Sequence, residues 1–373
     1  MKFLMVVLLT ILVQSKGQAS CKAHDEFTLI TNTVEKNFYD KTMKGLDWPE
    51  LKRKYQSTLT CIASDQQISK TINQLLNHLN TSHTVIFTPQ DIEYWSLKSI
   101  FSGDLKKFPV PFSGIHSEKF SDGTFVKYVL EGSPAHQQSI GPGDKLESIN
   151  GNPFSDLGFS VNTYSNLTWS MSPDNSFHAD IKPNTASMQS HYLKASRTSQ
   201  YIKIKNRRSV GYFHLWSGTH EAFLKALEKS LRFFKSRRVK AIVIDLRDGH
   251  GGANPDYLKL LQTDKFLKAI PKYFLINNGV VSGKEWIAAI IKRDRLGVLV
   301  GTKTAGAFMA GAPFDLLDGR FFLYLAVKEF LPPGIPKIEG IGIEPDIIVQ
   351  PCLKFCHNED PQLKKAFDLA FSL

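Results

Sequence analysis

Apolar residues recur at helical spacing through residues 25–80 of the chain. The intervals between them are three and four residues, which places them on one face of an α-helix. The first group is Phe27, Ile30, Val34 and Phe38, and the second is Ile68, Ile72, Leu75, Leu76 and Leu79. The pattern predicts a helical region ahead of the rest of the fold.

The pattern changes after Thr84, where residues 85–87 (VIF) read as a strand entering a new region. From about residue 108 to residue 190, Ser, Gly, Asn and Pro are frequent between short strand-like pieces. Residues 124–130 and 145–149 are two of these pieces. Short strands separated by turn-forming residues are typical of a small β-rich domain.

The C-terminal half alternates between strand and helix patterns. Residues 201–215 predict two strands around a turn at Asn206, and residues 220–237 predict a long amphipathic helix. Residues 239–246 form a nearly continuous apolar run of the kind found in a sheet covered on both faces. Strand and helix alternate again through residues 272–300, so this half predicts an α/β sheet domain.

The N-terminus has the features of a secretory signal peptide. Lys2 precedes a short apolar core, and Gly17 and Ala19 stand at the spacing that a signal peptidase accepts. Residues 1–19 are therefore predicted to be removed, leaving a secreted or periplasmic protein with no integral membrane segment. Removal of Lys2 and Lys16 lowers the net charge from +11 to +9.

The basic residues, the cysteines and the histidines of the chain indicate which partners and cofactors to expect. The basic residues are dispersed and form no stripe interleaved with aromatics, which argues against nucleic-acid binding. An oxidising compartment favours disulfides, with Cys352 and Cys356 able to close a small loop and Cys21 left with Cys61. No histidine–carboxylate cluster has ligand spacing, so neither a metal nor an organic cofactor is implied.

Ser282 is the residue with the most informative surroundings. It stands at a predicted turn, directly before the apolar run of a helix. A serine there is accessible, and the free N–H groups of the helix start can receive negative charge, as a nucleophile requires. The same residues, Ser282 to Glu285, also fit a helix capping box, in which Ser282 and Glu285 bond each other's backbone.

Five separated segments resemble those of the S41 serine peptidases, in the same order. Residues 131–151 look like the middle of a PDZ domain. The other segments run from Ile244 to Gly252 (IDLRDGHGG), Ser282 to Glu285 (SGKE), Gly301 to Gly306 (GTKTAG) and Glu339 to Asp346 (EGIGIEPD). The S41 family contains the C-terminal processing proteases and the tricorn-type proteases.

The resemblance implies a fold and a division of the chain. The expected fold is an α/β core with a ClpP/crotonase-like sheet, an N-terminal helical segment and an inserted PDZ-like β-rich domain. The expected domains are residues 1–19 (signal peptide), 20–100 (helical region), 101–195 (PDZ-like domain) and 196–373 (peptidase core).

The resemblance also implies a catalytic mechanism, and the two branches of the family differ in the base. C-terminal processing proteases use a lysine as the base, at the position where this chain has Ala307. Lys303 and Lys284 are nearby in the sequence, but neither stands at the position of the family's lysine. Tricorn-type members use a Ser-His pair and a late glutamate, which Ser82, His83 and Glu339 match. The prediction is a Ser82/His83/Ser282/Glu339 tetrad, with Glu339 preferred over Glu344.

Further residues follow from the same resemblance. Gly283 and one of Gly251 and Gly252 are expected to form the oxyanion hole, and Asp245 and Arg247 a structural pair. A carboxylate-binding loop is expected at Phe112, Ser113, Gly114 and Ile115, where it selects the tails of polypeptide substrates, unless the domain is only a spacer.

Two functions are compatible with the sequence. The first is a secreted or periplasmic serine endopeptidase that cleaves unfolded or extended polypeptides through an acyl-enzyme. The alternative is an inactive S41-fold protein that binds a peptide or another ligand, because retinoid-binding proteins of the vertebrate eye resemble the same core.

Overall fold

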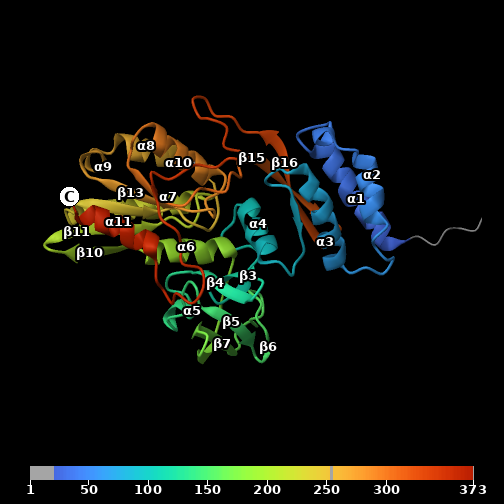
Figure 1. Cartoon of the computed structure of the whole chain (residues 1–373), viewed down its shortest axis with the longest axis horizontal. Helices are drawn as coiled ribbons and strands as arrows, with labels where there is room; N and C mark the ends of the chain where they lie inside the picture. Colours follow the sequence, from blue (N-terminus) through green and yellow to red (C-terminus); the bar gives the residue numbers. More distant parts are fainter. Residues whose placement is uncertain (1–20, 253–254, 373) are drawn as a thin grey trace, which may run out of the picture.

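The computed structural model describes residues 21–252 and 255–372 of the chain (Figure 1). The predicted signal peptide, residues 1–19, lies outside the described residues. A helical unit lies at one end of the molecule, an α/β unit at the other, and a β-rich unit below and between them (Figure 1). Within the described residues, no helix combines the length and the apolar character needed to cross a bilayer.

The α/β unit is built on a six-stranded sheet of order β10-β11-β12-β13-β14-β17. The first pair is an antiparallel hairpin, and every later pair is parallel. All five residues of β12 are buried, as the apolar run at residues 239–246 predicts. The strands are β10 (Tyr201–Lys205), β11 (Arg208–His214), β12 (Ala241–Asp245), β13 (Lys272–Ile276), β14 (Val298–Gly301) and β17 (Ile347–Ile348).

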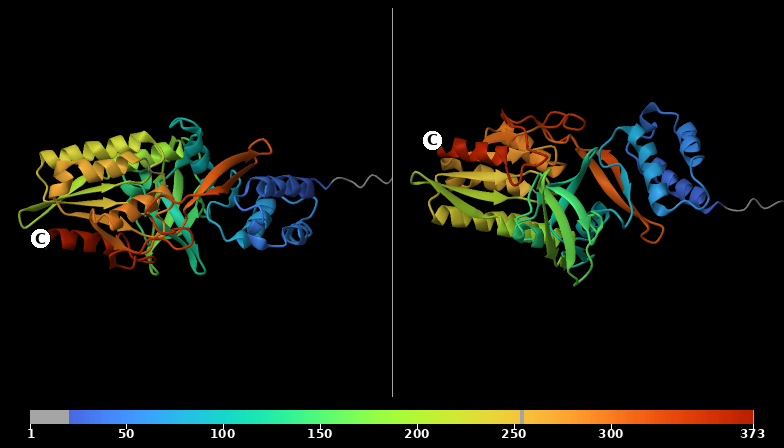
Figure 2. Two further views of the ribbon diagram at one scale, coloured as in Figure 1. Left: turned by 90° about the horizontal axis from the view of Figure 1, so that it is seen from above. Right: turned by 60° about the horizontal axis from the view of Figure 1, so that its bottom comes forward.

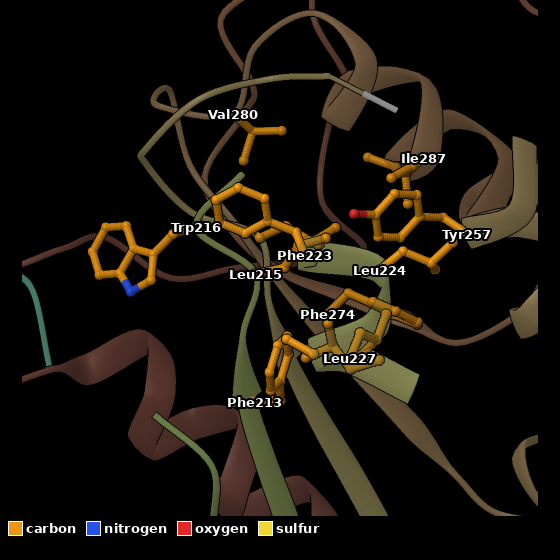
Figure 3. Packing of buried hydrophobic residues seen from close by; sticks show 14 of the residues in the cluster. Phe213, Leu215, Trp216, Phe223, Leu224, Leu227, Tyr257, Phe274, Val280 and Ile287 are labelled. Carbon is orange, nitrogen blue, oxygen red and sulfur yellow. The ribbon is translucent and has the colours of Figure 1, made fainter. Parts of the chain in front are cut away.

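Helices cover both faces of this sheet, which explains why its central strands are apolar on both sides. On one face Phe213 and Phe274 pack with Phe223 and Leu227 of the amphipathic helix α7 (Figure 3). On the other face the C-terminal helix α11 packs through Phe367. The helices of this unit are α6 (Met188–Thr198), α7 (Glu221–Ser236), α8 (Pro255–Thr263), α9 (Lys265–Ala269), α10 (Gly283–Arg293) and α11 (Pro361–Phe371).

The β-rich unit has a sheet of order β3-β4-β5-β7-β8, with β6 added beside β5. Its own core includes Val126, Leu146, Leu167 and Trp169. A separate pair, β2 with β9, joins the unit to the rest of the chain. The elements are β2 (Val110–Phe112), β3 (Ile115–Phe120), β4 (Gly123–Val129), α5 (Pro134–Gln137), β5 (Lys145–Ile149), β6 (Asn152–Pro153), β7 (Ser165–Ser172), β8 (Asn175–Ile181) and β9 (Asn184–Ala186).

The helical unit is completed by a hairpin from late in the chain. Phe27, Ile30 and Leu75 share a buried core with Phe321 and Leu323 of this hairpin. The views in Figure 2 agree in placing the hairpin between the helices and the α/β unit. The elements are α1 (Lys22–Asn37), η1 (Met43–Gly45), α2 (Trp48–Gln56), α3 (Asp65–Leu76), η2 (Asn77–Leu79), β1 (Val85–Phe87), β15 (Met309–Leu316) and β16 (Phe321–Glu329). Helix α4 (Ile92–Ser102) follows this unit and packs against α6.

Both disulfides that the spacing of the cysteines suggests are present, Cys21–Cys61 and Cys352–Cys356. The second bond closes a short loop that lies against the β-rich unit. Within that loop the N–H of Phe355 donates to the carbonyl of Gly143 at 2.6 Å, and the Lys354 ammonium pairs with Asp122 at 2.6 Å. The segment before α11 therefore fastens the β-rich unit to the α/β unit.

Replacing Cys21 and Cys61 together by serine is expected to lower the free energy of unfolding by about 4 kcal/mol, because this bond spans 40 residues. The same change at Cys352 and Cys356, which span 4 residues, is expected to cost about 2 kcal/mol. Denaturant unfolding of both variants beside the native protein measures the difference. Equal losses would contradict a stabilisation that grows with loop length.

Candidate active site

Ser282 occupies a strained turn between β13 and helix α10. Its φ of 54° and ψ of −127° belong to the first central position of a type II′ turn, a position that glycine usually takes. The N–H of Lys284 donates to the carbonyl of Val281 at 3.2 Å and closes the turn. Strain of this kind costs on the order of 1–3 kcal/mol and concentrates at functional sites.

The capping-box interpretation of Ser282 is wrong. The Ser282 side chain makes no capping bond to the helix. The carboxylate of Glu285 is buried and turns away, accepting from the Thr304 hydroxyl at 2.6 Å and from the N–H groups of Gly306 and Ala307, both at 2.8 Å. Those three donors satisfy Glu285, and among residues 21–252 and 255–372 no hydrogen bond to the Ser282 hydroxyl is found.

Ser82, His83 and Glu339 form one hydrogen-bonded group, although the glutamate lies more than 250 residues from the pair. The Glu339 carboxylate accepts from the Ser82 hydroxyl at 2.7 Å and from its N–H at 2.8 Å. The same hydroxyl oxygen lies 2.9 Å from Nδ1 of His83.

The order of these bonds fixes the tautomer of His83. A hydroxyl has one proton, and that of Ser82 is donated to Glu339, so its oxygen must accept from Nδ1–H. The lone pair of the neutral imidazole is then on Nε2, which is the atom available to take a proton. Burial lowers the pKa of His83 to about 4, and the nearby Glu339 carboxylate opposes that shift. His83 is therefore neutral near neutral pH, as a base must be.

The backbone from Gly306 to Met309 connects this group to Ser282. The carbonyl of Ala307 accepts from the N–H of Ser282 at 2.8 Å. The N–H of Phe308 donates to Glu339 at 2.7 Å, and that of Met309 donates to the Ser82 hydroxyl at 3.4 Å. Three successive residues, Ala307 to Met309, thus hold the nucleophile turn, the glutamate and the Ser-His pair at fixed places.

The β1–β16 pairing brings the Ser-His segment to this backbone. Val85 pairs with Tyr324, and the His83 ring lies edge-on to the Tyr324 ring with 4.9 Å between centroids. His83 itself has a φ of 53°, in the left-handed region that non-glycine residues seldom adopt. The sheet that completes the helical unit is therefore also the element that positions His83.

Within the described residues, no hydrogen bond joins His83 to Ser282. Bonds between base and nucleophile are often long without substrate and tighten when it binds. The two nearby lysines have other partners: Lys303 is half exposed and pairs with Glu344 at 3.1 Å, and the Lys284 ammonium donates to main-chain carbonyls. Glu344 thus pairs with Lys303, whereas Glu339 is the carboxylate that bonds Ser82.

The glycines of the expected oxyanion hole lie beside Ser282. A Cβ built on Gly251 would stand 2.7 Å from the Ser282 Cβ and 2.7 Å from the Val281 carbonyl oxygen, so only glycine fits. Across the described residues, the N–H groups of Gly283 and Gly251 donate to no other backbone group. Gly252, at a φ of 78°, packs against the backbone of Gly218 and Thr219 instead.

The loop of Phe112, Ser113, Gly114 and Ile115 lies between β2 and the edge strand β3. The side chains of Phe112, Ser113 and Ile115 are fully buried. Gly114 has a φ of 97°, and Ser133 occupies the space where a side chain at this position would lie. Backbone bonds tie the loop to the start of α5, with the N–H of Ala135 donating to Ser113 at 3.0 Å.

Asp245 and Arg247 form the structural pair that was expected. The Arg247 guanidinium bonds Asp245 at 2.6 Å and Asp360 at 2.6 Å, and the Tyr212 hydroxyl donates to Asp245 at 3.0 Å. The sequence did not single out the N–H of Phe308 or the anchoring role of Glu285. Glu285 stood in the motif with Ser282, but a capping box explained it, and a backbone N–H carries no sequence signal.

Three protein-family models match the chain: peptidase family S41 at residues 254–349, the tricorn protease C1 domain at residues 22–77, and the PDZ domain at residues 106–160. The carboxyl-terminal-processing peptidase 3 of Arabidopsis thaliana is 24% identical over 84% of this chain and 66% of its own length. The carboxyl-terminal-processing protease of Synechocystis sp. is 23% identical over 90% of this chain and 84% of its own. The chain thus spans about two thirds of the plant relative.

Solved structures share the fold. The photosystem II D1 C-terminal processing protease aligns with a TM-score of 0.55 at 16% identity, covering 88% of this chain and 93% of that one. The tricorn protease aligns with a TM-score of 0.53 at 16% identity, covering 94% of this chain and 37% of that one.

The fold and the matches define a class of protein, the α/β serine hydrolases that carry a PDZ domain beside the peptidase core. Within that class the chain is similar to the S41-type serine peptidases.

Proposed function

We propose that the protein is a secreted or periplasmic serine endopeptidase with a tricorn-type tetrad of Ser82, His83, Ser282 and Glu339. The observation that carries the proposal is the bond series from Glu339 through Ser82 to His83 Nδ1, which leaves Nε2 as the base. The backbone from Gly306 to Met309 ties that series to Ser282, whose hydroxyl has no hydrogen-bond partner in the described part of the chain.

The chemistry follows from these positions. His83 Nε2 takes the hydroxyl proton as the Ser282 oxygen attacks the peptide carbonyl carbon. The oxyanion is received by the N–H groups of Gly283 and Gly251. The imidazolium returns its proton to the leaving amine, the C–N bond breaks, and water then hydrolyses the acyl-enzyme with His83 again as base. Glu339, acting through Ser82, stabilises the imidazolium that forms in each half-reaction.

The β-rich unit is proposed to present the substrate as an added strand. β3 is an edge strand of its sheet, and a PDZ domain extends such an edge with an extended peptide. The N–H of Ser117 already donates to Asp156 at 3.2 Å, so a bound peptide would displace that carboxylate. Unfolded polypeptides, including their C-terminal tails, supply the extended backbone that this mode requires.

The compartment and the division of labour are part of the same proposal. Two disulfides support an oxidising location, consistent with removal of residues 1–19. Residues 20–100 supply Ser82 and His83, residues 101–195 the substrate surface, and residues 196–373 the nucleophile, the oxyanion hole and Glu339.

Labelling by a fluorophosphonate probe tests the proposed function without knowledge of the natural substrate. The mature chain is expected to be labelled at Ser282 and to degrade reduced casein, whereas Ser282→Ala is expected to do neither. His83→Ala is expected to label at least a hundredfold more slowly, because the hydroxyl has lost its base. If the native chain neither labels nor cleaves, the inactive binding protein becomes the better assignment.

A further inference from the structure

Lys284 is a fully buried lysine two residues beyond Ser282, with an exposed fraction of 0%. Its ammonium donates to the carbonyl of Asp248 and lies 3.5 Å from each of the carbonyls of Leu215 and Trp216. Burying an ammonium group costs free energy unless its three N–H groups have hydrogen-bond acceptors. Here three main-chain carbonyls are within reach of them. The proposed mechanism gives this residue no role.

The three carbonyls belong to the two segments that surround the oxyanion hole. Leu215 and Trp216 follow β11 and belong to the same buried cluster as Val280, which precedes the nucleophile turn (Figure 3). Asp248 follows β12 and stands three residues before Gly251. The segments are also bonded to each other, since Trp216 O accepts from the N–H of His250 at 2.9 Å and Gly251 O from that of Gly218 at 2.8 Å.

We propose that Lys284 is a positioning residue of the active site: its ammonium holds the loop of residues 248–251 against helix α10. The bracing keeps the Gly251 N–H and the Ser282 hydroxyl at the separation that an oxyanion needs. Lys284 touches no reacting atom and acts through the loop alone. This inference rests on the proposed serine-peptidase function and adds to it a residue outside the tetrad.

The charge of Lys284 gives the proposal a signature in the pH dependence. Burial lowers the pKa of Lys284 to about 7, while the carboxylates of Asp248 and Asp245 favour its protonated form. His250, on the same loop, has its own pKa lowered to about 3, so it stays neutral across this range. A protonated ammonium makes the stronger bonds to carbonyls, so the brace weakens as pH rises through about 7.

A lysine acting as the base would produce the opposite dependence. Its amine must be neutral, so activity would rise through pH 7 and not fall. Under the proposal, kcat/KM of the native chain on labelled casein rises as His83 loses its proton near pH 4, and falls above pH 7. The native chain alone decides between these two profiles, whether or not any variant folds.

The matched variants are Lys284→Met and Lys292→Met on the same helix. Lys292 is partly exposed and donates to the carbonyl of Glu344 at 2.6 Å, away from the oxyanion loop. Lys284→Met is expected to lower kcat about a hundredfold with KM changed less than about threefold, to slow fluorophosphonate labelling equally, and to lose the alkaline fall. Lys292→Met is expected to match the native chain, and circular dichroism checks that both variants are folded.

Each other outcome has a definite meaning. If Lys284→Met retains native kcat while His83→Ala is inactive, Lys284 has no positioning role and the tetrad still holds. If Lys284→Met is as inactive as Ser282→Ala and the native activity rises through pH 7, the lysine is the base, and both this inference and the proposed tetrad are wrong. A rise in KM alone would assign Lys284 to substrate binding and overturn the positioning role.

Discussion

Replacing Ser282 by alanine is expected to lower kcat/KM on unfolded casein by roughly 10⁵-fold, because the nucleophile is lost while the oxyanion donors remain. His83→Ala is expected to produce a loss of similar order, since the two side chains act as one unit. The double variant Ser282→Ala/His83→Ala should then be no worse than either single one. The measurement is the initial cleavage rate of the four proteins at equal concentrations.

The strained backbone at Ser282 supplies a control for this prediction. Ser282→Gly removes the same hydroxyl but relieves a φ of 54°, so it is expected to unfold at a higher temperature than Ser282→Ala. Equal inactivity of the two variants, with a stability difference of about 1 kcal/mol, would separate the loss of chemistry from any loss of fold. Activity that survives in Ser282→Ala would exclude this serine as the nucleophile.

Replacing Gly251 by alanine is expected to lower kcat about 10²–10³-fold, the cost of losing one oxyanion donor. The added methyl group would stand 2.7 Å from the Ser282 Cβ, so either the loop or the nucleophile turn must move. Because the substitution leaves the substrate contacts outside the oxyanion hole unchanged, KM should change little. Steady-state kinetics with labelled casein separates the two constants.

Gly297→Ala is the matched control for Gly251→Ala. Its added Cβ would lie 2.6 Å from the carbonyl oxygen of Lys272, which is a comparable clash with the backbone. Lys272 is the first residue of β13, whereas Ser282 follows the other end of that strand. This variant is expected to lose stability but to keep the native kcat per folded molecule. If both variants lose kcat equally, the Gly251 effect is a general consequence of crowding and the oxyanion assignment is wrong.

The elements with the strongest patterns were predictable from the sequence. The apolar spacing over residues 220–237 predicts α7, observed as Glu221–Ser236, and the run at residues 239–246 contains the fully buried β12. The turn at Asn206 is also observed, between β10 and β11, where Asn206 and Arg207 both adopt positive φ. These features are local, so residue periodicity and turn chemistry determine them.

The capping box at Ser282 shows where local reasoning fails. The residue types from Ser282 to Glu285 fit a capping box, but Glu285 accepts hydrogen bonds from three donors in another part of the chain. The donors are the hydroxyl of Thr304 and the N–H groups of Gly306 and Ala307. A buried carboxylate takes the more complete set of partners, and no local pattern reveals that such a set exists. Lys284 is a similar case, because its three carbonyl partners lie 36 to 69 residues away in the sequence.

The sequence by itself determined the class of fold, the order of the elements and the candidate residues for acyl transfer. Only the tertiary structure decided how they meet, since the β1–β16 pairing carries His83 to the backbone of Gly306–Met309 and that backbone holds Glu339 and Ser282. The physical reason is that main-chain N–H and C=O groups make the bonds that hold these residues together, both with side chains and with each other. Every residue carries the same N–H and C=O, so the sequence does not mark which of them become the scaffold of a site.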